Sequence, residues 1–395
     1  MRFLVVAPQP FLTARGTPLS VYYRTMVMAE YGARIDLLAY GEGEDVEIPG
    51  VNLIRIPRLS WVGPVPVGPS WRKLFLDLIM IAWTVGLLAR HRYDAVHAHE
   101  ESVFWCRFLK PLFRFRLIYD MHSSLPQQLS NFQFSKSELL LATFRALEHT
   151  CLRAADAVIT ICPDLRDYAL QTGVAPEKQL LIENSIFEDV KLRKFQGAAR
   201  EAVAELVPKN PPLDFERPIV LYAGTFEQYQ GIEMLIRAFA QVCAQRTDAQ
   251  LLLVGGSPQQ VAHAAEIVAE LRLAGSVYLT GKMSKNAAMR YTRLATVLVS
   301  PRLHGTNTPL KIYEQIASGK PLVATRIWSH TQVLNEEVCI LVEPDPESLA
   351  RGLLLAINDP DAGREVAARA RRLYEEQYAR PVYEQKIRRL LEIVS

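Results

Sequence analysis

Lys311 and Glu314 are the residues whose types and spacing first suggest chemistry. They stand three positions apart, so in a helix both side chains project from one face. Thr308 is a good helix N-cap, and Pro309 suits the first helical position, where the missing N–H of proline costs nothing. A helix is therefore expected from Pro309 to about Ser318.

The start of this helix predicts an anion site. The backbone amides of Thr308, Leu310 and Lys311 would point out of the helix end, where the dipole favours an anion such as phosphate. One helical turn rises about 5 Å, so Glu314 would lie one turn deeper than the amides. This order suits a nucleotide, with its diphosphate at the helix tip and its ribose hydroxyls on Glu314. A solvated Lys311–Glu314 pair is the alternative.

Similar helix-start chemistry occurs near the N-terminus. Thr17 and Pro18 repeat the cap residues described above, and they come after an apolar run at Phe3 to Ala7 that is typical of a buried strand. The sequence thus predicts two anion-facing helix starts, one in each half of the chain. An ordinary strand-to-helix connection explains the first of them equally well.

Strand and helix patterns alternate along the whole chain. Continuous apolar runs such as Ile219 to Ala223 are typical of parallel strands, and the alternation predicts an α/β protein. Lys209-Asn210-Pro211-Pro212 is typical of a linker, so the domain change should fall between about 185 and 217. We expect an N-terminal domain over residues 1–190 and a C-terminal domain over residues 191–377.

Several polar residues of the first half lie where predicted strands end. Ligands of doubly wound sheets bind beyond the carboxyl ends of the strands, and His99, Glu100, Asp120 and His122 all lie at such ends. His122 is the most prominent of them. The alternative for His122 is a structural histidine that caps the following loop.

The composition excludes several classes of protein. Of 395 residues 49% are apolar and 22% charged, as in a soluble globular protein, and a net charge of +3 is too small to argue for nucleic acid. The five cysteines lack a CxxC spacing, so a reducing cytoplasm fits better than a zinc site or disulfides. The N-terminus suits a first strand rather than a signal peptide. The apolar run Leu74 to Ala89 contains Asp77 and is short for a bilayer span.

The stretch Ser300 to Thr325 resembles the nucleotide-sugar site of retaining glycosyltransferases of family four, in the glycogen-synthase-like clan. The resemblance covers nearly the whole chain and implies the GT-B fold, in which two Rossmann-like domains face a cleft and the last helix, here about 378–395, packs back on the first domain. It also implies transfer of a sugar, with retention, from a UDP- or GDP-linked donor to a glycan, lipid-linked or small-molecule acceptor. Cell-surface polysaccharide or glycolipid synthesis is the expected setting, without metal or other cofactor.

The family pattern assigns roles to residues of this sequence. His122 would assist at the donor sugar through its imidazole or carbonyl, Lys311 would stabilise the leaving diphosphate, and Glu100 is a candidate for the acceptor hydroxyl. The donor site would be formed by Gly16, Gly224, Thr225, Lys282, Arg302, Asn307, Thr308, Pro309, Leu310, Lys311 and Glu314, with Arg15 as a neighbour of Gly16.

The sequence departs from the family pattern at three charged positions. Thr306 replaces the first of two glutamates, of which Glu314 is the second, and Thr225 and Gln230 replace the usual arginine and lysine that bind the diphosphate. These losses favour a second hypothesis, a GT-B subunit that binds and supports a catalytic partner. A third hypothesis, a sugar-nucleotide epimerase, needs acid–base carboxylates that the sequence does not supply.

Two further patterns have competing interpretations. Asp359-Pro360-Asp361 superficially matches an Asp-x-Asp metal motif, but its place between two helices predicts cap and turn residues. Residues 102–119 interleave basic and aromatic side chains, which suits an anionic membrane surface. The basic residues could instead pair with Asp94, Glu100 and Glu101 or bind an anionic acceptor.

Overall fold

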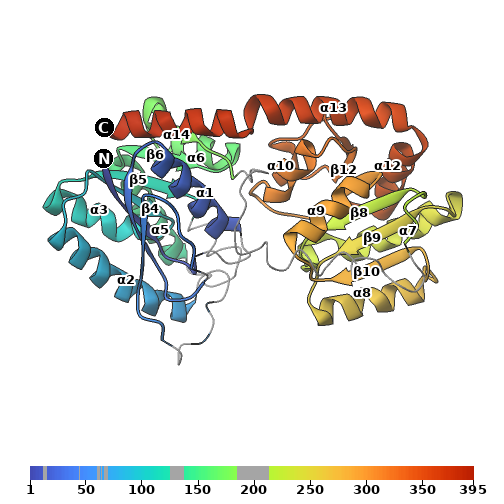
Figure 1. The fold of residues 1–395 in the computed structure, drawn as a ribbon, viewed down its shortest axis with the longest axis horizontal. Coiled ribbons are helices and arrows are strands. Elements are labelled where there is room, and N and C mark those ends of the chain that lie inside the picture. Colours follow the sequence, from blue (N-terminus) through green and yellow to red (C-terminus); the bar gives the residue numbers. More distant parts are fainter. Residues whose placement is uncertain are drawn as a thin grey trace. The chain divides into compact units, whose positions relative to one another are not determined.

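The computed structural model describes residues 1–11, 16–43, 45–59, 63, 65, 70–124, 138–184 and 213–395. The chain forms two compact units, residues 1–186 with 380–395, and residues 187–379 (Figure 1). The expected boundary at 190/191 falls outside the described residues, and the chain rejoins the first unit at Arg380. Both units have helices on both faces of a parallel sheet, so the predicted α/β class is confirmed.

The first unit contains a parallel sheet of seven strands in the order β3-β2-β1-β4-β5-β6-β7. The order reverses direction between β1 and β4, which pair in parallel from Phe3 opposite Ala95 to Val6 opposite Ala98. The strands are short and mostly buried on both faces: β1 (Arg2–Ala7), β2 (Arg34–Ala39), β3 (Val51–Arg55), β4 (Ala95–His99), β5 (Arg116–Met121), β6 (Ala157–Thr160) and β7 (Gln179–Leu181).

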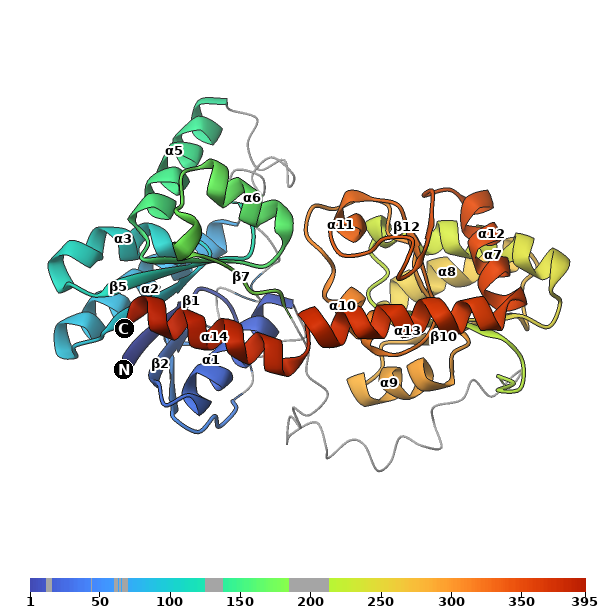
Figure 2. The same ribbon diagram turned by 90° about the horizontal axis from the view of Figure 1, so that it is seen from above.

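Alternate residues of these strands face different helices. Leu4 and Val6 of β1 join a core with one set of helices, whereas Phe3 lies on the opposite face, near the C-terminal helix (Figure 2). The helices of that core are α2 (Trp71–Arg90), α3 (Ser102–Phe113), α5 (Glu138–Ala154) and α6 (Pro163–Gln171). Helices α1 (Gly16–Glu30) and α14 (Arg380–Val394) pack together on the other face, and a 3₁₀ turn, η2 (Pro176–Lys178), precedes β7.

The second unit repeats the plan with a parallel sheet of six strands in the order β10-β9-β8-β11-β12-β13. This is the doubly wound Rossmann order, with the switch point between β8 and β11. Its strands are β8 (Ile219–Ala223), β9 (Gln250–Val254), β10 (Val277–Gly281), β11 (Val297–Ser300), β12 (Leu322–Thr325) and β13 (Ile340–Val342).

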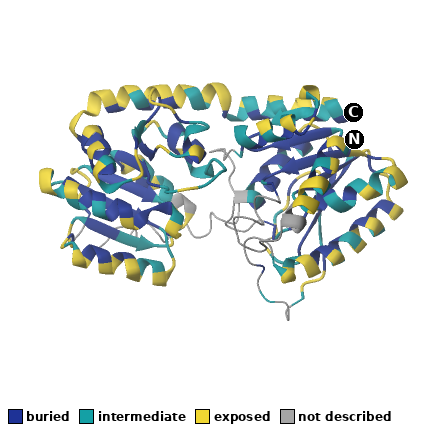
Figure 3. Ribbon diagram, turned by 180° about the vertical axis from the view of Figure 1, so that it is seen from behind, coloured by how far each residue is buried: buried dark blue, intermediate teal, exposed yellow. Residues whose placement is uncertain are grey.

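The helices of the second unit cover both faces of this sheet, so its strands are largely buried while the outer sides of the helices are exposed (Figure 3). They are η4 (Gln228–Gln230), α7 (Ile232–Gln245), α8 (Pro258–Glu270), α9 (Lys285–Leu294), α10 (Leu310–Ala317), α11 (Trp328–Thr331), α12 (Pro346–Asn358) and α13 (Pro360–Gln377).

Side-chain caps fix the starts of two of these helices. Asp345 caps α12 by accepting from Ser348 N over 2.8 Å, and Asp359 caps α13 by accepting from Ala362 N over 3.0 Å. The cap-and-turn prediction for Asp359-Pro360-Asp361 is thereby confirmed. Of the helices that the structure describes, none combines the length and apolar character needed to cross a bilayer.

Candidate functional site

The loops that follow β8 and β11 form a candidate anion site in the second unit. They leave neighbouring strands at the switch point, where open α/β sheets bind ligands. The two loops pack closely: Leu303 N donates to Tyr229 O over 2.8 Å, and a Cβ on Gly231 would lie 2.1 Å from Pro301 O. Gly231 also has a φ of +72°, so both space and backbone conformation require glycine there.

Lys311 lies in the first turn of α10 and reaches back to the loop after β8. Its Nζ donates to Gln230 Oε1 over 2.9 Å and lies 4.4 Å from the centre of the Tyr222 ring. Burial, together with the positive charge of Arg302, lowers the pKa of Lys311 to about 7. A bound phosphate would supply the negative charge that these surroundings lack.

Arg302 is a second cation in the loop after β11. Its Cζ lies 5.1 Å from the centre of the Tyr229 ring, and it donates to His304 O over 2.9 Å and to Asn307 O over 3.3 Å. Burial lowers the pKa of Arg302 below its usual value. Within the described part of the chain, therefore, neither Lys311 nor Arg302 has a carboxylate as its recorded partner.

The start of α10 differs from the prediction by one residue. Pro309, with ψ of 135°, is the N-cap, and Leu310 is the first helical residue, so the prediction that Thr308 caps the helix is wrong. Because the chain is extended at Pro309, the Thr308 hydroxyl does not reach the helix amides, and it has no hydrogen-bond partner among the described residues. The amides of Leu310 and Lys311 open the helix without a side-chain cap.

The other predicted donor-site residues of the second unit differ in exposure. Glu314 is exposed on α10, while Lys311 is half-buried, and Lys282 is exposed after β10. Thr225 is exposed and its carbonyl accepts from the Tyr222 hydroxyl over 2.7 Å. A Cβ on Gly224 would lie 2.9 Å from the Tyr222 hydroxyl, so glycine lets the backbone pass close to this side chain. The roles of these residues toward a donor stay predictions.

In the first unit, Gly16 is the first residue of α1, so Thr17 lies inside the helix and does not precede it as expected. The cap prediction for Thr17 is therefore wrong, and Arg15 lies outside the described residues.

A buried polar cluster lies at the carboxyl ends of β4 and β5 in the first unit. Asp120 Oδ2 lies 2.9 Å from His97 Nε2 and 3.2 Å from His99 Nδ1, and the Arg24 guanidinium donates to the same oxygen. His122 Nε2 lies 3.1 Å from His99 Nδ1 and 3.3 Å from Asp120 Oδ1. The structure thus brings His99, Asp120 and His122 together.

Burial sets the charges in this cluster. It lowers the pKa of His97 and His99, and it lowers the pKa of His122 to about 4, so all three rings are neutral near pH 7. Burial alone would raise the pKa of Asp120, but Arg24 and the histidines hold it well below its usual range. The cluster is a carboxylate paired with a guanidinium beside three neutral imidazoles.

The same atoms could be taken for a metal site, because ligand atoms of His97, His99 and Asp120 lie within 4.8 Å of one another. Asp120 Oδ2 already accepts from Arg24, however, and a metal ion would face that guanidinium. Asp120 is therefore better suited to orienting the imidazole rings through hydrogen bonds than to binding a cation. The sequence pointed to His99, Asp120 and His122, while Arg24 and His97 were missed, although His97 and His99 share one face of a strand.

Comparison with known families covers both units. Residues 217–359 match the family model described as "Glycosyl transferases group 1", and residues 25–185 match the "Glycosyl transferase 4-like domain" model. The chain belongs to the group 1 glycosyltransferases. The resemblance seen in the sequence is therefore confirmed, and the two Rossmann-like units are those of the GT-B fold.

Curated relatives of this glycosyltransferase differ in how much of the chain they match. The α-D-kanosaminyltransferase of Streptomyces kanamyceticus is 24% identical over 96% of both chains. The α-maltose-1-phosphate synthase of Mycolicibacterium smegmatis is 28% identical over 59% of this chain and 62% of that protein. A phosphatidyl-myo-inositol mannosyltransferase of Mycobacterium tuberculosis is 31% identical over 45% of this chain and 47% of that protein.

Solved structures agree with the fold. Sucrose-phosphate synthase from Thermosynechococcus elongatus has a TM-score of 0.74 at 24% identity, covering 99% of this chain and 98% of that one. Anabaena HepE in complex with UDP has a TM-score of 0.70 at 17% identity, covering 99% of this chain and 100% of that one.

Glu100 of this glycosyltransferase belongs to a second acidic group in the first unit. It has a φ of +49° and pairs with Lys73 Nζ at 3.6 Å, while Glu101 pairs with the same Nζ at 2.5 Å. Burial raises the pKa of Glu100 to about 7, despite the opposing charge of Lys73. Burial likewise raises the pKa of Asp77 to about 8, and the Tyr40 hydroxyl donates to its Oδ1 over 2.5 Å. A role of Glu100 toward an acceptor stays a prediction.

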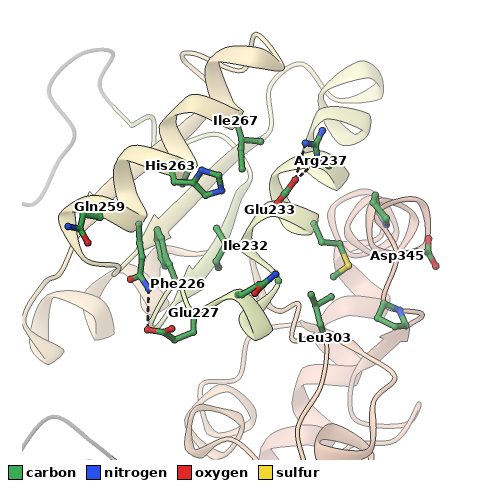
Figure 4. Close-up of a pocket in the computed structure, with 17 residues that line it drawn as sticks. Phe226, Glu227, Ile232, Glu233, Arg237, Gln259, His263, Ile267, Leu303 and Asp345 are labelled. Carbon is green, nitrogen blue, oxygen red and sulfur yellow. Dashed lines mark hydrogen bonds and ion pairs between the residues drawn. The ribbon is translucent and has the colours of Figure 1, made fainter. Parts of the chain in front are cut away.

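A cavity of about 730 Å³ lies beside the Gln228–Gly231 turn in the second unit (Figure 4). Its wall includes the apolar side chains of Phe226 and Ile232. Its acidic side chains outnumber its one arginine, Arg237, which pairs with a glutamate of α7 at 3.0 Å. A surplus of carboxylates does not suit a diphosphate. The acidic residues are Glu227, Glu233 and Asp345.

The basic and aromatic segment 102–119 divides between core and surface. Most of its aromatic side chains pack into or against the core of the first unit, namely Phe104, Trp105, Phe113 and Phe115, whereas Phe108 is exposed. The recorded ion pairs do not follow the alternative in which these basic residues pair with Asp94, Glu100 and Glu101. Lys110 and Arg116 pair with Asp156, and both glutamates pair with Lys73. The reason is the register of β5, which places Asp156 beside this segment.

Proposed function

We propose that the chain transfers a sugar, with retention, from a nucleotide-diphosphate donor to an acceptor hydroxyl. One observation supports this most: Lys311 and Arg302 are held at the switch point by rings, an amide and carbonyl oxygens, with no recorded carboxylate partner among the described residues. Such a pair of cations at a helix start is suited to a diphosphate. The complex of HepE with UDP adds support, since that protein has a similar fold.

In the proposed mechanism the enzyme positions the donor and stabilises the leaving group. Lys311, Arg302 and the amides of Leu310 and Lys311 would bind the diphosphate and offset the charge that develops when the glycosidic bond breaks. The acceptor oxygen would attack on the same face, and the leaving phosphate would take its proton. The proposal requires neither a metal nor another cofactor. His122, neutral at pH 7, would assist at the sugar through its ring or carbonyl.

The acceptor is proposed to be a glycan or a lipid-linked alcohol, and the donor to be UDP- or GDP-linked. Relatives named as phosphatidyl-myo-inositol mannosyltransferases support a lipid acceptor, and those named for kanosaminyl transfer and maltose-1-phosphate synthesis keep the small-molecule class open. A lipid-linked acceptor in polysaccharide or glycolipid synthesis would place the enzyme at the inner face of the cytoplasmic membrane.

A second candidate function is a subunit that binds a nucleotide sugar and supports a catalytic partner. Thr225, Gln230 and Thr306 favour it, because they leave the diphosphate with fewer charged contacts than the family usually provides. In the structure Gln230 accepts a hydrogen bond from Lys311. A neutral amide therefore stands beside Lys311 at the position where the family usually has a second lysine.

Replacement of Lys311 tests the proposal. Lys311→Met should lower kcat/KM for the donor by about 100-fold, as expected when a preorganised donor to the developing charge is lost. Lys320→Met, three residues beyond the end of the same helix, is the matched control and should behave like the wild type. Equal activity of Lys311→Met and wild type would refute the site. A thermal-shift screen against UDP-, GDP- and ADP-sugars should first identify the donor; binding without any donor hydrolysis or transfer would favour the supporting subunit.

A further inference from the structure

The outer side of α2 is apolar where a surface helix is normally polar. Counting along the helix, all but one of its exposed apolar residues fall three or four positions apart on one side and so form a stripe; Trp83 lies beside it. The largest of them are strongly exposed, Trp71 at 76% and Leu78 at 60%. The stripe, called the outer stripe of α2 below, consists of Trp71, Leu74, Phe75, Leu78, Ala82, Val85 and Ala89.

The charges inside α2 are turned away from this stripe. Between Arg72 and Arg90, the only charged residues of the helix are Lys73 and Asp77. Lys73 pairs with Glu101 at 2.5 Å, and Asp77 is buried against the Tyr40 hydroxyl. The outer stripe is therefore uncharged along its length, with an arginine near each end.

Helix α3 packs beside α2 and continues the apolar surface. Phe108 is 61% exposed and Leu112 is 72% exposed. The ends of the two helices enclose an open hollow of about 1790 Å³. Basic side chains outnumber acidic ones in its lining. The basic residues are Arg90, Arg92, Arg107, Lys110, Arg114 and Arg116, and the acidic residues are Asp94 and Asp156.

The two acids of the hollow are already engaged. Asp156 pairs with Lys110 at 2.8 Å and with Arg116 at 3.6 Å, and Asp94 accepts from the backbone N of Arg2 over 2.6 Å. Arg90, Arg92 and Arg114 have no recorded ion pair within the described ranges of the chain, so this end of the surface carries uncompensated positive charge. In a bilayer interface, acyl chains lie next to headgroup phosphates. An apolar stripe beside a basic hollow is complementary to this arrangement.

We propose that α2 and α3 form a docking surface for an anionic phospholipid bilayer. The outer stripe of α2, with Phe108 and Leu112, would lie among the upper acyl chains, and the arginines of the hollow would contact headgroup phosphates. The apolar part of this contact lies mainly on α2, because most aromatic residues of segment 102–119 are buried. That segment adds Phe108, Leu112 and basic residues of the hollow. The inference deepens the proposed function, because a lipid-linked acceptor would be reached from this surface, and it rests on that function for its biological setting.

Vesicle flotation with the full chain tests the surface. The wild type should float with vesicles of phosphatidylcholine and phosphatidylglycerol and much less with phosphatidylcholine alone. Leu74→Glu with Leu78→Glu should reduce the floating fraction by about tenfold or more. Arg90→Gln with Arg92→Gln should weaken partitioning roughly fivefold for each arginine removed, and only on anionic vesicles.

Controls separate this surface from general stickiness and from the proposed function. Leu355→Glu, at an exposed leucine of α12 in the second unit, and Arg290→Gln, at an exposed arginine of α9, should float like the wild type. Donor hydrolysis in the absence of vesicles should be the same for the wild type and the leucine pair, which shows that the variants fold and that the transfer site is intact.

Three results would overturn the proposal: wild type that stays at the bottom with anionic vesicles, a leucine pair that floats as well as the wild type, or self-association of the wild type that the leucine pair abolishes while neither binds vesicles. The last result would assign the stripe to a second copy of the chain.

Discussion

At the scale of single residues, Lys311 has the surroundings of a lysine that loses its proton easily. The Tyr222 ring and the neutral Gln230 side chain replace water around its ammonium group, and Arg302 adds a second positive charge. A ring face attracts a cation but does not cancel its charge. These surroundings therefore oppose the protonation of Lys311, and a bound diphosphate would favour it.

Donor capture should weaken as the pH rises through about 7. The pKa of Lys311 is lowered to about 7, so the ammonium form that binds the diphosphate prevails below that pH and is lost above it. Since kcat/KM reports the free enzyme, its value for the donor should fall about tenfold per pH unit above about pH 8. By contrast, kcat should stay level, because the bound phosphates raise the pKa of Lys311 again. Steady-state kinetics with the donor as the varied substrate measures both.

Lys311→Arg is the control for this profile, because a guanidinium keeps its proton throughout the range. Its kcat/KM should show no such fall on the alkaline side, even if its value is lower. The assignment would be wrong if both enzymes lost kcat/KM in parallel. Glu100, whose pKa burial raises to about 7, would then be the group to examine.

At the scale of helices and loops, the sequence predicts the bounds of an element correctly where neighbouring residues, such as a cap, determine its ends. Strand β8 has the predicted bounds, Ile219–Ala223, and α13 begins behind Asp359, which was predicted to be a cap residue. The predicted start of α10 was wrong because Pro309 has an extended conformation. It lies in a loop that packs on Tyr229, which is distant in sequence. The partners of Asp120 were hidden for the same reason, since Arg24 is 96 positions away. Long-range register cannot be derived from residue spacing alone.

The packing of the two site loops makes Gly231 a sensitive position. Gly231→Ala places a Cβ 2.1 Å from Pro301 O at a φ of +72°, so it should strain the backbone and also separate the loops that hold Gln230 and Arg302. We expect a loss of about 2–4 kcal/mol in the free energy of unfolding and a higher KM for the donor. Urea denaturation and donor kinetics measure the two effects.

Gly319→Ala is the matched comparison. It has a φ of +69° in the same unit, but a Cβ there would meet nothing within 4 Å. It should cost about 1–2 kcal/mol through backbone strain alone and leave the KM for the donor unchanged. Equal losses of stability for the two variants would show that the loops separate without cost and that their packing does not hold the site.

At the scale of the whole molecule, the first unit is completed by a helix that follows the second unit in the sequence. Helix α14 packs on α1 and beside β6 and β7, and Arg24 of the histidine cluster is hydrogen-bonded to Tyr383. Lys386 pairs with Glu183 at 2.5 Å, and Arg380 pairs with Glu30 at 2.7 Å. Residues 380–395, which follow the second unit in the sequence, are therefore part of the scaffold around Asp120, so the first unit should gain its full stability only after the second unit has been synthesised.

Leu390→Ala tests how far the first unit depends on this helix. Leu390 is fully buried on α14, so its truncation should cost about 2–5 kcal/mol of the stability of the first unit. Four of the five tryptophans of the chain lie in residues 1–186, so a fluorescence melt reports mainly on that unit and should shift to lower temperature. The neighbouring Leu391 is only half-buried, and Leu391→Ala should cost about 1 kcal/mol or less. If Leu390→Ala and Leu391→Ala melted at the same temperature, the packing of α14 would contribute little to the stability of the first unit. The hydrogen bond between Tyr383 and Arg24 would then not stabilise the histidine cluster.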